Sequence, residues 1–273
     1  MPVRQEIAHG PVEGVRVGRL DRGLNTTAVV YRVGGTVVDA GPPNQWRAVR
    51  GWLDRRPPDR LLLTHHHEDH AGNAGRVAAR YGLVPLAPAA SRARLAAGFG
   101  TPPVQRLVWG RMRPVETAPL PARVEMPEGG ALVPVAAPGH ADDMTCFLWP
   151  ERGLLFSADL YLSRRLTHLR ADEDLETLMR SIMAVLRLDF ETVLCAHRGV
   201  VESGRTALAD KLDALAALCA DARALRQRGV GLREATRRLL GPEDAVSWAS
   251  AFDISKRNLV RQAARVDLSE APA

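Results

Sequence analysis

The sequence predicts an α/β unit followed by a smaller, purely helical unit. Between residues 12 and 200, short apolar runs bounded by turn residues alternate with stretches of helical spacing. Metal-binding side chains follow several of the apolar runs, and converging loops at strand ends are where α/β sheets place functional groups. From Ser203 onward only helical patterns appear. We therefore expect two units, one over residues 1–202 and one over residues 203–273.

The first part of the chain reads as a strand meander and then as a strand, a loop and a helix in series. Gly34-Gly35 separates two β-rich runs and predicts a hairpin. Pro57-Pro58 ends the first predicted helix. The expected strands are Val12–Val17, Thr27–Val33, Thr36–Val38 and Leu61–Leu63, and the expected helices are Gln45–Leu53 and Gly72–Tyr81.

The middle of the chain alternates strands and helices around one irregular segment. This segment, residues 98–127, is rich in Gly, Pro and Arg. It either lines or covers a site or is a long surface connection, and the sequence leaves both interpretations open. The expected strands are Val84–Leu86, Leu132–Ala136, Cys146–Trp149, Leu154–Ser157 and Thr192–Cys195, and the expected helices are Pro88–Ala97 and Asp174–Leu186.

The C-terminal unit begins with an amphipathic helix at Thr206–Arg228. Shorter helices are expected at Leu232–Leu240, Ala245–Phe252 and Ser255–Val266, and a winged-helix arrangement is one form that they could take. Clustered arginines make this unit locally basic. We favour a helical cap or a dimerisation element, compatible with a homodimer, over a nucleic-acid surface.

The composition is that of an ordinary globular protein. A chain of 273 residues that is 46% hydrophobic can bury a full core. No segment approaches the roughly 20 apolar residues of a membrane span, and the first residues lack the apolar region of a signal peptide. We therefore expect a cytoplasmic location and no membrane partner. Three scattered cysteines agree with a reducing compartment.

The charge is compatible with nucleic acid but does not favour it. The chain has a formal net charge of +6 and a pI near 9.9. Nearly all of the basic residues are Arg, and they are interleaved with acids over most of the chain. We therefore expect a small-molecule substrate and keep nucleic acid as an alternative partner.

Four histidines and two acids lie close together in the stretch from Thr64 to Asn73, directly after the strand at Leu61–Leu63. Imidazole nitrogens and carboxylate oxygens are the ligands that Zn²⁺ prefers. Because side chains alternate along an extended chain, His65 and His67 can face one ion together. Asp69 and His70, in the turn that follows, can face a second ion.

Further metal-type residues follow other apolar runs. His140 comes after Leu132–Ala136, Asp159 after Leu154–Ser157, and His197 after Thr192–Cys195. Asp39 stands at the end of Thr36–Val38. Each residue alone is a weak indication, and their shared position just beyond a strand is the informative feature.

The motif His65-x-His67-x-Asp69-His70, followed by His140, Asp159 and His197, resembles that of the metallo-β-lactamase superfamily. The resemblance covers roughly residues 12–200 and implies an αββα sandwich with a dinuclear metal site at its edge. It implies that His65, His67 and His140 bind one ion and that Asp69, His70 and His197 bind the other, with Asp159 bridging both. Asp39 would support the ligand loop by hydrogen bonding. His66, Glu68 and Cys195 are given no ligand role.

The resemblance also implies hydrolysis. Two zinc ions per chain are expected, although iron or manganese is compatible with the same ligands. Such ions make hydroxide available at neutral pH and polarise the bond under attack. Asp69 is the expected catalytic residue, because it could orient that hydroxide or pass its proton to the leaving group.

Departures from the family's subclasses narrow the substrate. True β-lactamases lack an Asp at the position that corresponds to Asp159. Quorum-signal lactonases carry a Tyr where this chain has Leu162. The residues Arg198–Val201 do not resemble the glutathione-binding residues of glyoxalase II. We expect a small-molecule ester, thioester or lactone as substrate. A metal-dependent endoribonuclease acting on single-stranded RNA is the main alternative. A non-heme iron dioxygenase or a non-catalytic metal-binding module on the same fold are the others.

Overall fold

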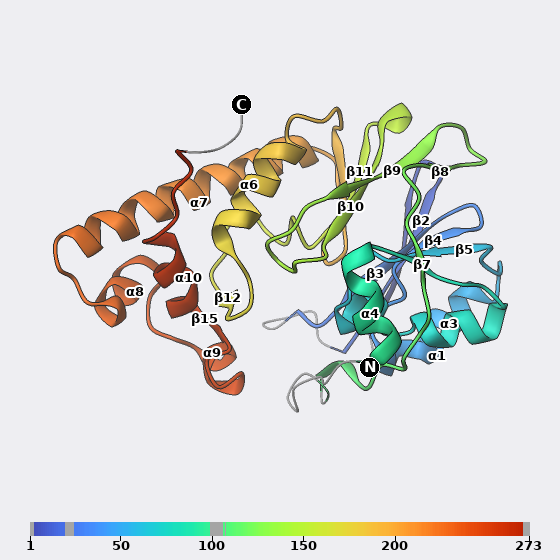
Figure 1. The fold of residues 1–273 in the computed structure, drawn as a ribbon, viewed down its shortest axis with the longest axis horizontal. Helices are drawn as coiled ribbons and strands as arrows, with labels where there is room; N and C mark the ends of the chain where they lie inside the picture. The colour runs from blue at the N-terminus through green and yellow to red at the C-terminus, as the bar shows by residue number, and fades with distance from the viewer. Residues whose placement is uncertain (1–2, 20–24, 99–105, 107, 270–273) are drawn as a thin grey trace.

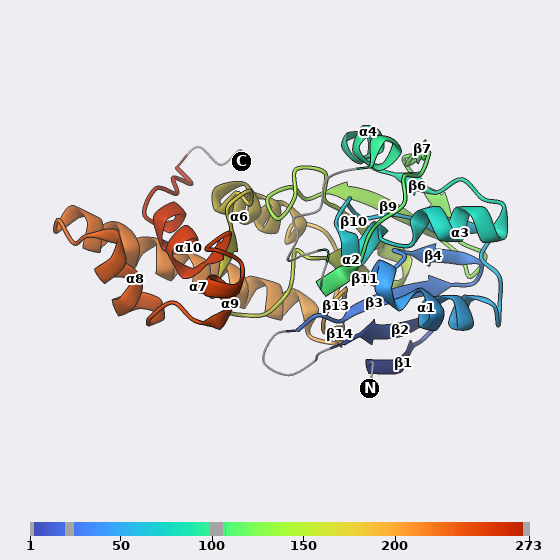
Figure 2. The same ribbon diagram turned by 90° about the horizontal axis from the view of Figure 1, so that it is seen from below.

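A computed structural model of the protein describes residues 3–19, 25–98, 106 and 108–269. Two sheets pack face to face, and helices cover the outer face of each sheet (Figure 1). The expected αββα sandwich is therefore confirmed. Figure 2 shows the C-terminal helices extending to one side of the sheets.

Among the described residues, the first sheet has seven strands in chain order. Its first four strands run antiparallel, and the last four, counting the shared one, run parallel. The strands are β1 (Val3–His9), β2 (Val12–Gly18), β3 (Ala28–Val33), β4 (Thr36–Val38), β5 (Arg60–Leu62), β6 (Leu86–Ala87) and β7 (Ala118–Pro119).

In the described part of the chain, the second sheet has six strands in the order β14, β13, β11, β10, β9, β8. The expected hairpin is formed by β10 and β11, with Phe147 opposite Phe156. The strands are β8 (Val124–Glu125), β9 (Ala131–Ala136), β10 (Thr145–Trp149), β11 (Leu154–Ala158), β13 (Thr192–Cys195) and β14 (Gly199–Val201).

Alternation along the central strands divides the core into layers. In β10, Phe147 and Trp149 face the first sheet, whereas Cys146 and Leu148 face the helices on the other side. A strand that is buried on both faces is apolar at most positions, and β10 is apolar from Cys146 to Trp149 after the buried Thr145. Burial of both faces fixes the register, because a slip by one residue would exchange the two layers.

Helices complete the two outer layers. The helices α1 (Trp46–Leu53) and α3 (Ala74–Tyr81) pack on the first sheet, together with α4 (Ala89–Ala97). The second sheet packs against α6 (Leu175–Val185) and α7 (Gly204–Gln227). The remaining elements are α2 (Glu68–Ala71), the short 3-10 helices Pro43–Gln45 and Pro150–Arg152, α8 (Leu232–Leu240), α9 (Ala245–Ala249), α10 (Lys256–Ala263), and the strands β12 (Leu169–Arg170) and β15 (Ile254–Ser255).

The C-terminal helices share a core with the second sheet. One cluster of buried side chains runs from Val193 on β13 through Leu208 and Leu215 on α7 to Leu259 on α10. In addition, β15 pairs with β12, so the C-terminal segment adds a strand beside the first unit. The division at residues 202 and 203 stays a prediction, and the packing across it is continuous. In the described part of the chain, no helix combines the length and apolar character that crossing a membrane requires.

Most of the expected elements are present, and their bounds differ from the expected ones by three residues at most. The expected helix Gly72–Tyr81 instead begins at Ala74, after the separate turn α2. The sequence patterns did not predict β1, β7, β8, β12, β14 or β15. Within the irregular segment 98–127, β7 and β8 extend one edge of each sheet, and residues 99–105 and 107 lie outside the described residues.

Candidate metal centre

The histidine loop begins where β5 ends and is held by Asp39 at the end of the neighbouring strand β4. The backbone N–H of Thr64 donates to Asp39 Oδ1 over 2.9 Å, and Asp39 Oδ2 lies 2.7 Å from His70 Nδ1. Asp39 itself has a φ of 63°, in the left-handed region that Asp tolerates better than most residues. This buried carboxylate therefore joins the start and the end of the histidine loop, as expected for a supporting residue.

Three imidazole nitrogens form the first half of the centre. His67 Nδ1 lies 3.0 Å from His65 Nε2 and 3.0 Å from His140 Nε2. Nitrogens bound tetrahedrally to one Zn²⁺ at its usual bond length are about 3.3 Å apart. Alternation along the loop places His65 and His67 on the same side, and the end of β9 brings in His140, which is 73 residues away from His67.

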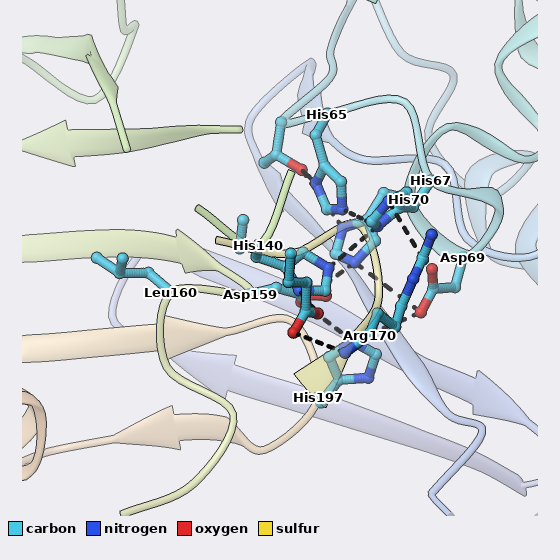
Figure 3. Close-up of polar contacts among 12 residues, drawn as sticks. His65, His67, Asp69, His70, His140, Asp159, Leu160, Arg170 and His197 are labelled. Atoms are coloured by element: carbon cyan, nitrogen blue, oxygen red, sulfur yellow. Dashed lines mark hydrogen bonds and ion pairs between the residues drawn. The ribbon is translucent and has the colours of Figure 1, made fainter. Parts of the chain in front are cut away.

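The second half contains Asp69, His70 and His197, and Asp159 lies between the two halves (Figure 3). Asp159 Oδ1 is 3.2 Å from His70 Nε2 and 3.1 Å from His197 Nε2. The other oxygen, Oδ2, is 3.0 Å from His140 Nε2. Asp69 Oδ2 is 3.5 Å from His197 Nε2. All seven residues singled out in the sequence are thus brought together, and one carboxylate faces both halves.

The opposite ring nitrogen of most of these histidines is held by the protein. His197 Nδ1 lies 2.6 Å from the carbonyl oxygen of Thr27, and His140 Nδ1 lies 2.6 Å from Glu173 Oε1. His65 Nδ1 is 3.0 Å from Thr64 Oγ1. Because a neutral imidazole carries one proton, an acceptor at Nδ1 directs the Nε2 lone pair toward the centre.

Two buried atoms at the middle of the centre make no hydrogen bond among the described residues. They are His70 Nε2 and Asp159 Oδ1, which lie 3.2 Å apart. A buried polar atom that makes no hydrogen bond costs free energy, and proteins rarely retain one without a reason. A cation that accepts both lone pairs would satisfy these atoms, so the residues present fit a metal.

Three histidines of the centre have raised pKa values, because carboxylates beside them stabilise the protonated imidazole. Burial alone would lower the pKa of His140, but the carboxylates of Asp159 and Glu173 outweigh it and raise this pKa to about 10. The pKa values of His70 and His197 are also raised, because nearby carboxylates outweigh burial. The same three imidazoles hold the pKa of Asp159 well below its usual range, against the effect of burial. Any cation bound here must displace these protons.

The two histidines of the loop that face His140 have lowered pKa values. Burial, followed by the charge of neighbouring histidines, holds the pKa values of His65 and His67 well below 6.5. These imidazoles are therefore neutral near pH 7, the state in which imidazole coordinates a metal.

The residues that were given no ligand role lie outside the centre. His66 turns toward Asp143, with His66 Nδ1 2.9 Å from Asp143 Oδ1. Cys195 donates its Sγ–H to the carbonyl oxygen of Tyr161 over 2.7 Å, and burial raises the pKa of its thiol to about 11. A thiol that remains protonated is a poor metal ligand.

Three residues near the centre were not found from the sequence: Glu173, Arg170 and Lys211. The Arg170 guanidinium lies 3.3 Å from His67 Nε2. Lys211, on α7, is fully buried and donates to the carbonyl oxygen of Leu160, one residue after Asp159, over 2.6 Å. The chain has two lysines, Lys211 and Lys256, and a lysine on the apolar face of a predicted helix was the only available indication.

We expect the pH dependence of stability to change when Lys211 is replaced by Met. Burial lowers the pKa of Lys211 from 10.5 to about 8. Between these pH values the unfolded chain binds a proton that the folded chain does not bind, so stability rises with pH. Urea unfolding should show the wild type gaining about 3 kcal/mol relative to Lys211→Met between pH 7 and pH 10.5. A difference that stays constant over this range would contradict the prediction.

Comparison with protein families gives one match over most of the α/β unit. The model of the family described as "Metallo-beta-lactamase superfamily" matches residues 21–197. The chain is 29% identical over 185 residues to the lactamase-like protein aptB of Emericella nidulans, covering 66% of this chain and 53% of that protein. It is 28% identical over 189 residues to a hydroxyacylglutathione hydrolase of Cereibacter sphaeroides, covering 68% and 63%. The matched part is therefore less than two thirds of each relative's length.

Solved structures resemble the fold over most of the chain. A β-lactamase domain protein from Burkholderia ambifaria superposes with a TM-score of 0.66 at 16% identity, covering 95% of this chain and 84% of that one. A metallo-β-lactamase from Pontibacter korlensis gives a TM-score of 0.61 at 18% identity, covering 78% and 98%. At these identities the comparison supports the architecture alone.

Proposed function

The chain belongs to the metallo-β-lactamase superfamily, and on this premise we propose that it is a dinuclear metal-dependent hydrolase of a small-molecule ester, thioester or lactone. One observation carries the proposal: Asp159 faces both halves of the centre, and His70 Nε2 and Asp159 Oδ1 make no hydrogen bond there. Buried polar atoms normally form hydrogen bonds within the protein. Two that do not are better explained by a bound cation than by a role in folding.

The two halves of the centre define the proposed ligands. His65, His67 and His140 would hold one ion, and Asp69, His70 and His197 would hold the other, with Asp159 shared. Two divalent ions bound there would supply a lowered pKa for water and an electrophile for the bond under attack. Zinc is the proposed metal, and iron or manganese would suit the same donors.

Residues of the chain orient this centre and handle the proton. Asp39 and Glu173 accept from His70 and His140, which fixes the direction of each ring. Asp69 Oδ2 lies 3.5 Å from His197 Nε2 and 4.0 Å from His70 Nε2 and keeps limited contact with solvent. Its carboxylate could therefore accept a proton from the attacking water and return it to the leaving group.

Two observations support a small organic substrate over RNA. The relative from Cereibacter sphaeroides is named for hydrolysis of hydroxyacylglutathione, which is a thioester. Several arginines of the C-terminal helices are paired with acids: Arg237 and Arg238 both contact Glu234, and Arg257 contacts Glu243. These pairs reduce the positive charge that a phosphate backbone would require.

The test is turnover with a matched pair of variants. Protein loaded with zinc should bind about two ions per chain and hydrolyse at least one member of a panel of esters, thioesters and lactones. Asp69→Ala should lower kcat by at least about 10²-fold, which is the usual contribution of a general acid or base. Asp142→Ala is the control, because Asp142 is exposed and pairs with Arg94 outside the centre.

Two outcomes would overturn the proposal. The first is fully metal-loaded protein that cleaves no member of the panel. The second is iron as the metal in protein purified without added metal, together with oxygen consumption, which would favour a dioxygenase on the same fold.

A further inference from the structure

A cavity of about 350 Å³ opens beside the centre, next to His140, Asp159 and His197. Its wall comes mainly from residues 162–168, between β11 and β12, and from Arg170 of β12, and Ile254 of β15 lines it from the C-terminal unit. The irregular segment 98–127, which the sequence suggested could line or cover a site, contributes no described residue to this lining. We call this cavity the substrate cleft. A substrate that reaches the centre through it would contact the side chains of this wall.

The cleft combines an apolar surface with positive charge. Leu162, Leu166 and Ile254 are partly buried and supply the apolar part. Arg165, Arg170 and Arg198 supply the charge, and the acids that line the same cavity, Asp159 and Glu173, face the histidines of the centre. A substrate that fits this lining has an apolar portion and an anionic group.

The three arginines differ in how far their charge is already matched. Arg170 is neutralised by Asp172, with Nε 3.0 Å from Oδ1 and Nη2 2.6 Å from Oδ2. Among the described residues, neither Arg165 nor Arg198 makes an ion pair, and both are exposed. The positive charge that a ligand would meet thus lies mainly on Arg165 and Arg198.

Arg198 is held in position at the cleft. Its Nε donates to the carbonyl oxygen of Leu162 over 2.8 Å, so that its remaining N–H groups are left for a ligand. It directly follows His197 in the chain, which limits its distance from the centre. A guanidinium that is anchored through one nitrogen loses less entropy on binding an anion than a free side chain does.

We propose that the substrate cleft selects an acyl thioester whose thiol portion carries a carboxylate or phosphate, with the anion at Arg165 and Arg198 and the apolar portion against Leu162, Leu166 and Ile254. This inference rests on the hydrolase function proposed above and names its substrate class. Charge-assisted hydrogen bonds to guanidinium supply the discrimination between anionic and neutral thiols.

The test uses three octanoyl thioesters that differ only in the thiol: neutral N-acetylcysteamine, 3-mercaptopropanoate and coenzyme A. The wild type should show kcat/KM at least about tenfold higher for one anionic thioester than for the neutral one, since a hydrogen bond to a charged group is worth about that factor. The preferred anionic thioester distinguishes carboxylate from phosphate. The preference should weaken as ionic strength rises.

Variants assign the preference to the two arginines. In the double variant Arg165→Gln, Arg198→Gln, the ratio of anionic to neutral kcat/KM should fall toward one. Arg164→Gln is the matched control, because Arg164 is exposed and pairs with Asp210, and it does not line the cavity. The control should retain the wild-type ratio.

Binding of an uncleavable thioether analogue, 3-(octylthio)propanoate, separates this inference from the hydrolase proposal. Equal cleavage of all three thioesters by the wild type would overturn the anionic selection and leave the hydrolase standing. If no thioester is cleaved, calorimetric binding of the thioether to wild type and not to the double variant would keep the anion site and remove thioester hydrolysis, while the panel of esters and lactones decides on the hydrolase. Equal binding to both proteins would remove the anion site.

Discussion

Replacing Asp159 by Asn should lower kcat/KM for any cleaved substrate by about 10³-fold and reduce the bound metal from two ions per chain toward one. The Asp159 carboxylate faces both halves of the centre, within 3.0 Å of His140 and 3.2 Å of His70. An amide presents only one strong acceptor atom and no charge, so it cannot serve two cations equally. Elemental analysis of the dialysed protein and steady-state kinetics measure the two effects.

Asp142→Asn is the matched control for this prediction. Asp142 is an exposed aspartate close in the chain to His140, and its carboxylate pairs with Arg94 outside the centre. We expect the control to keep both ions and its rate. Retention of two ions and of full activity by Asp159→Asn would show that the shared carboxylate is not needed.

Replacing Gly139 by Ala should destabilise the protein by about 4 kcal/mol and disturb His140, the next residue. Gly139 has a φ of 132°, which residues with a Cβ adopt only with strain. A Cβ added here would also overlap the backbone N and Cα of Leu178 on α6. Neither part can shift easily, because Asp174 at the start of α6 donates its backbone N–H to the carbonyl oxygen of Gly139.

The control for backbone effects is Gly51→Ala. Gly51 lies inside α1 and is exposed, and an added Cβ would meet no atom within 4 Å. Because Ala restricts the unfolded chain, this variant should be more stable than the wild type by about 0.5 kcal/mol. Urea unfolding of both variants measures the contrast, and equal stabilities would contradict the steric argument.

The ligand positions were predictable because they depend on local rules. Alternation of side chains places His65 and His67 together, and each of His140, Asp159 and His197 follows a strand that reads as an apolar run. Strands that are buried on both faces, such as β10 and β13, are the easiest to find from the sequence. The family resemblance then supplied the grouping of these residues.

Short or polar strands were missed for an equally physical reason. The strand β1 contains Arg4, Gln5 and Glu6, and β12 and β15 have two residues each. Such segments are extended only because a neighbouring strand pairs with them, and a pairing between distant segments leaves no periodicity in the sequence. The substrate cleft was missed in the same way, since Leu166 and Ile254 line one cavity only in the folded chain.

The sequence by itself determined which residues can bind metal, because the type and spacing of ligands are local properties of the chain. Only the tertiary structure decided which groups hold the ligands in place. Glu173 contacts His140, and the carbonyl oxygen of Thr27 contacts His197. Lys211 donates to the carbonyl oxygen of Leu160, the residue after Asp159. It also decided which arginines at the cleft make no ion pair with another described residue. Partners such as Thr27 and His197 are 170 residues apart, and packing of the two sheets alone brings them into contact.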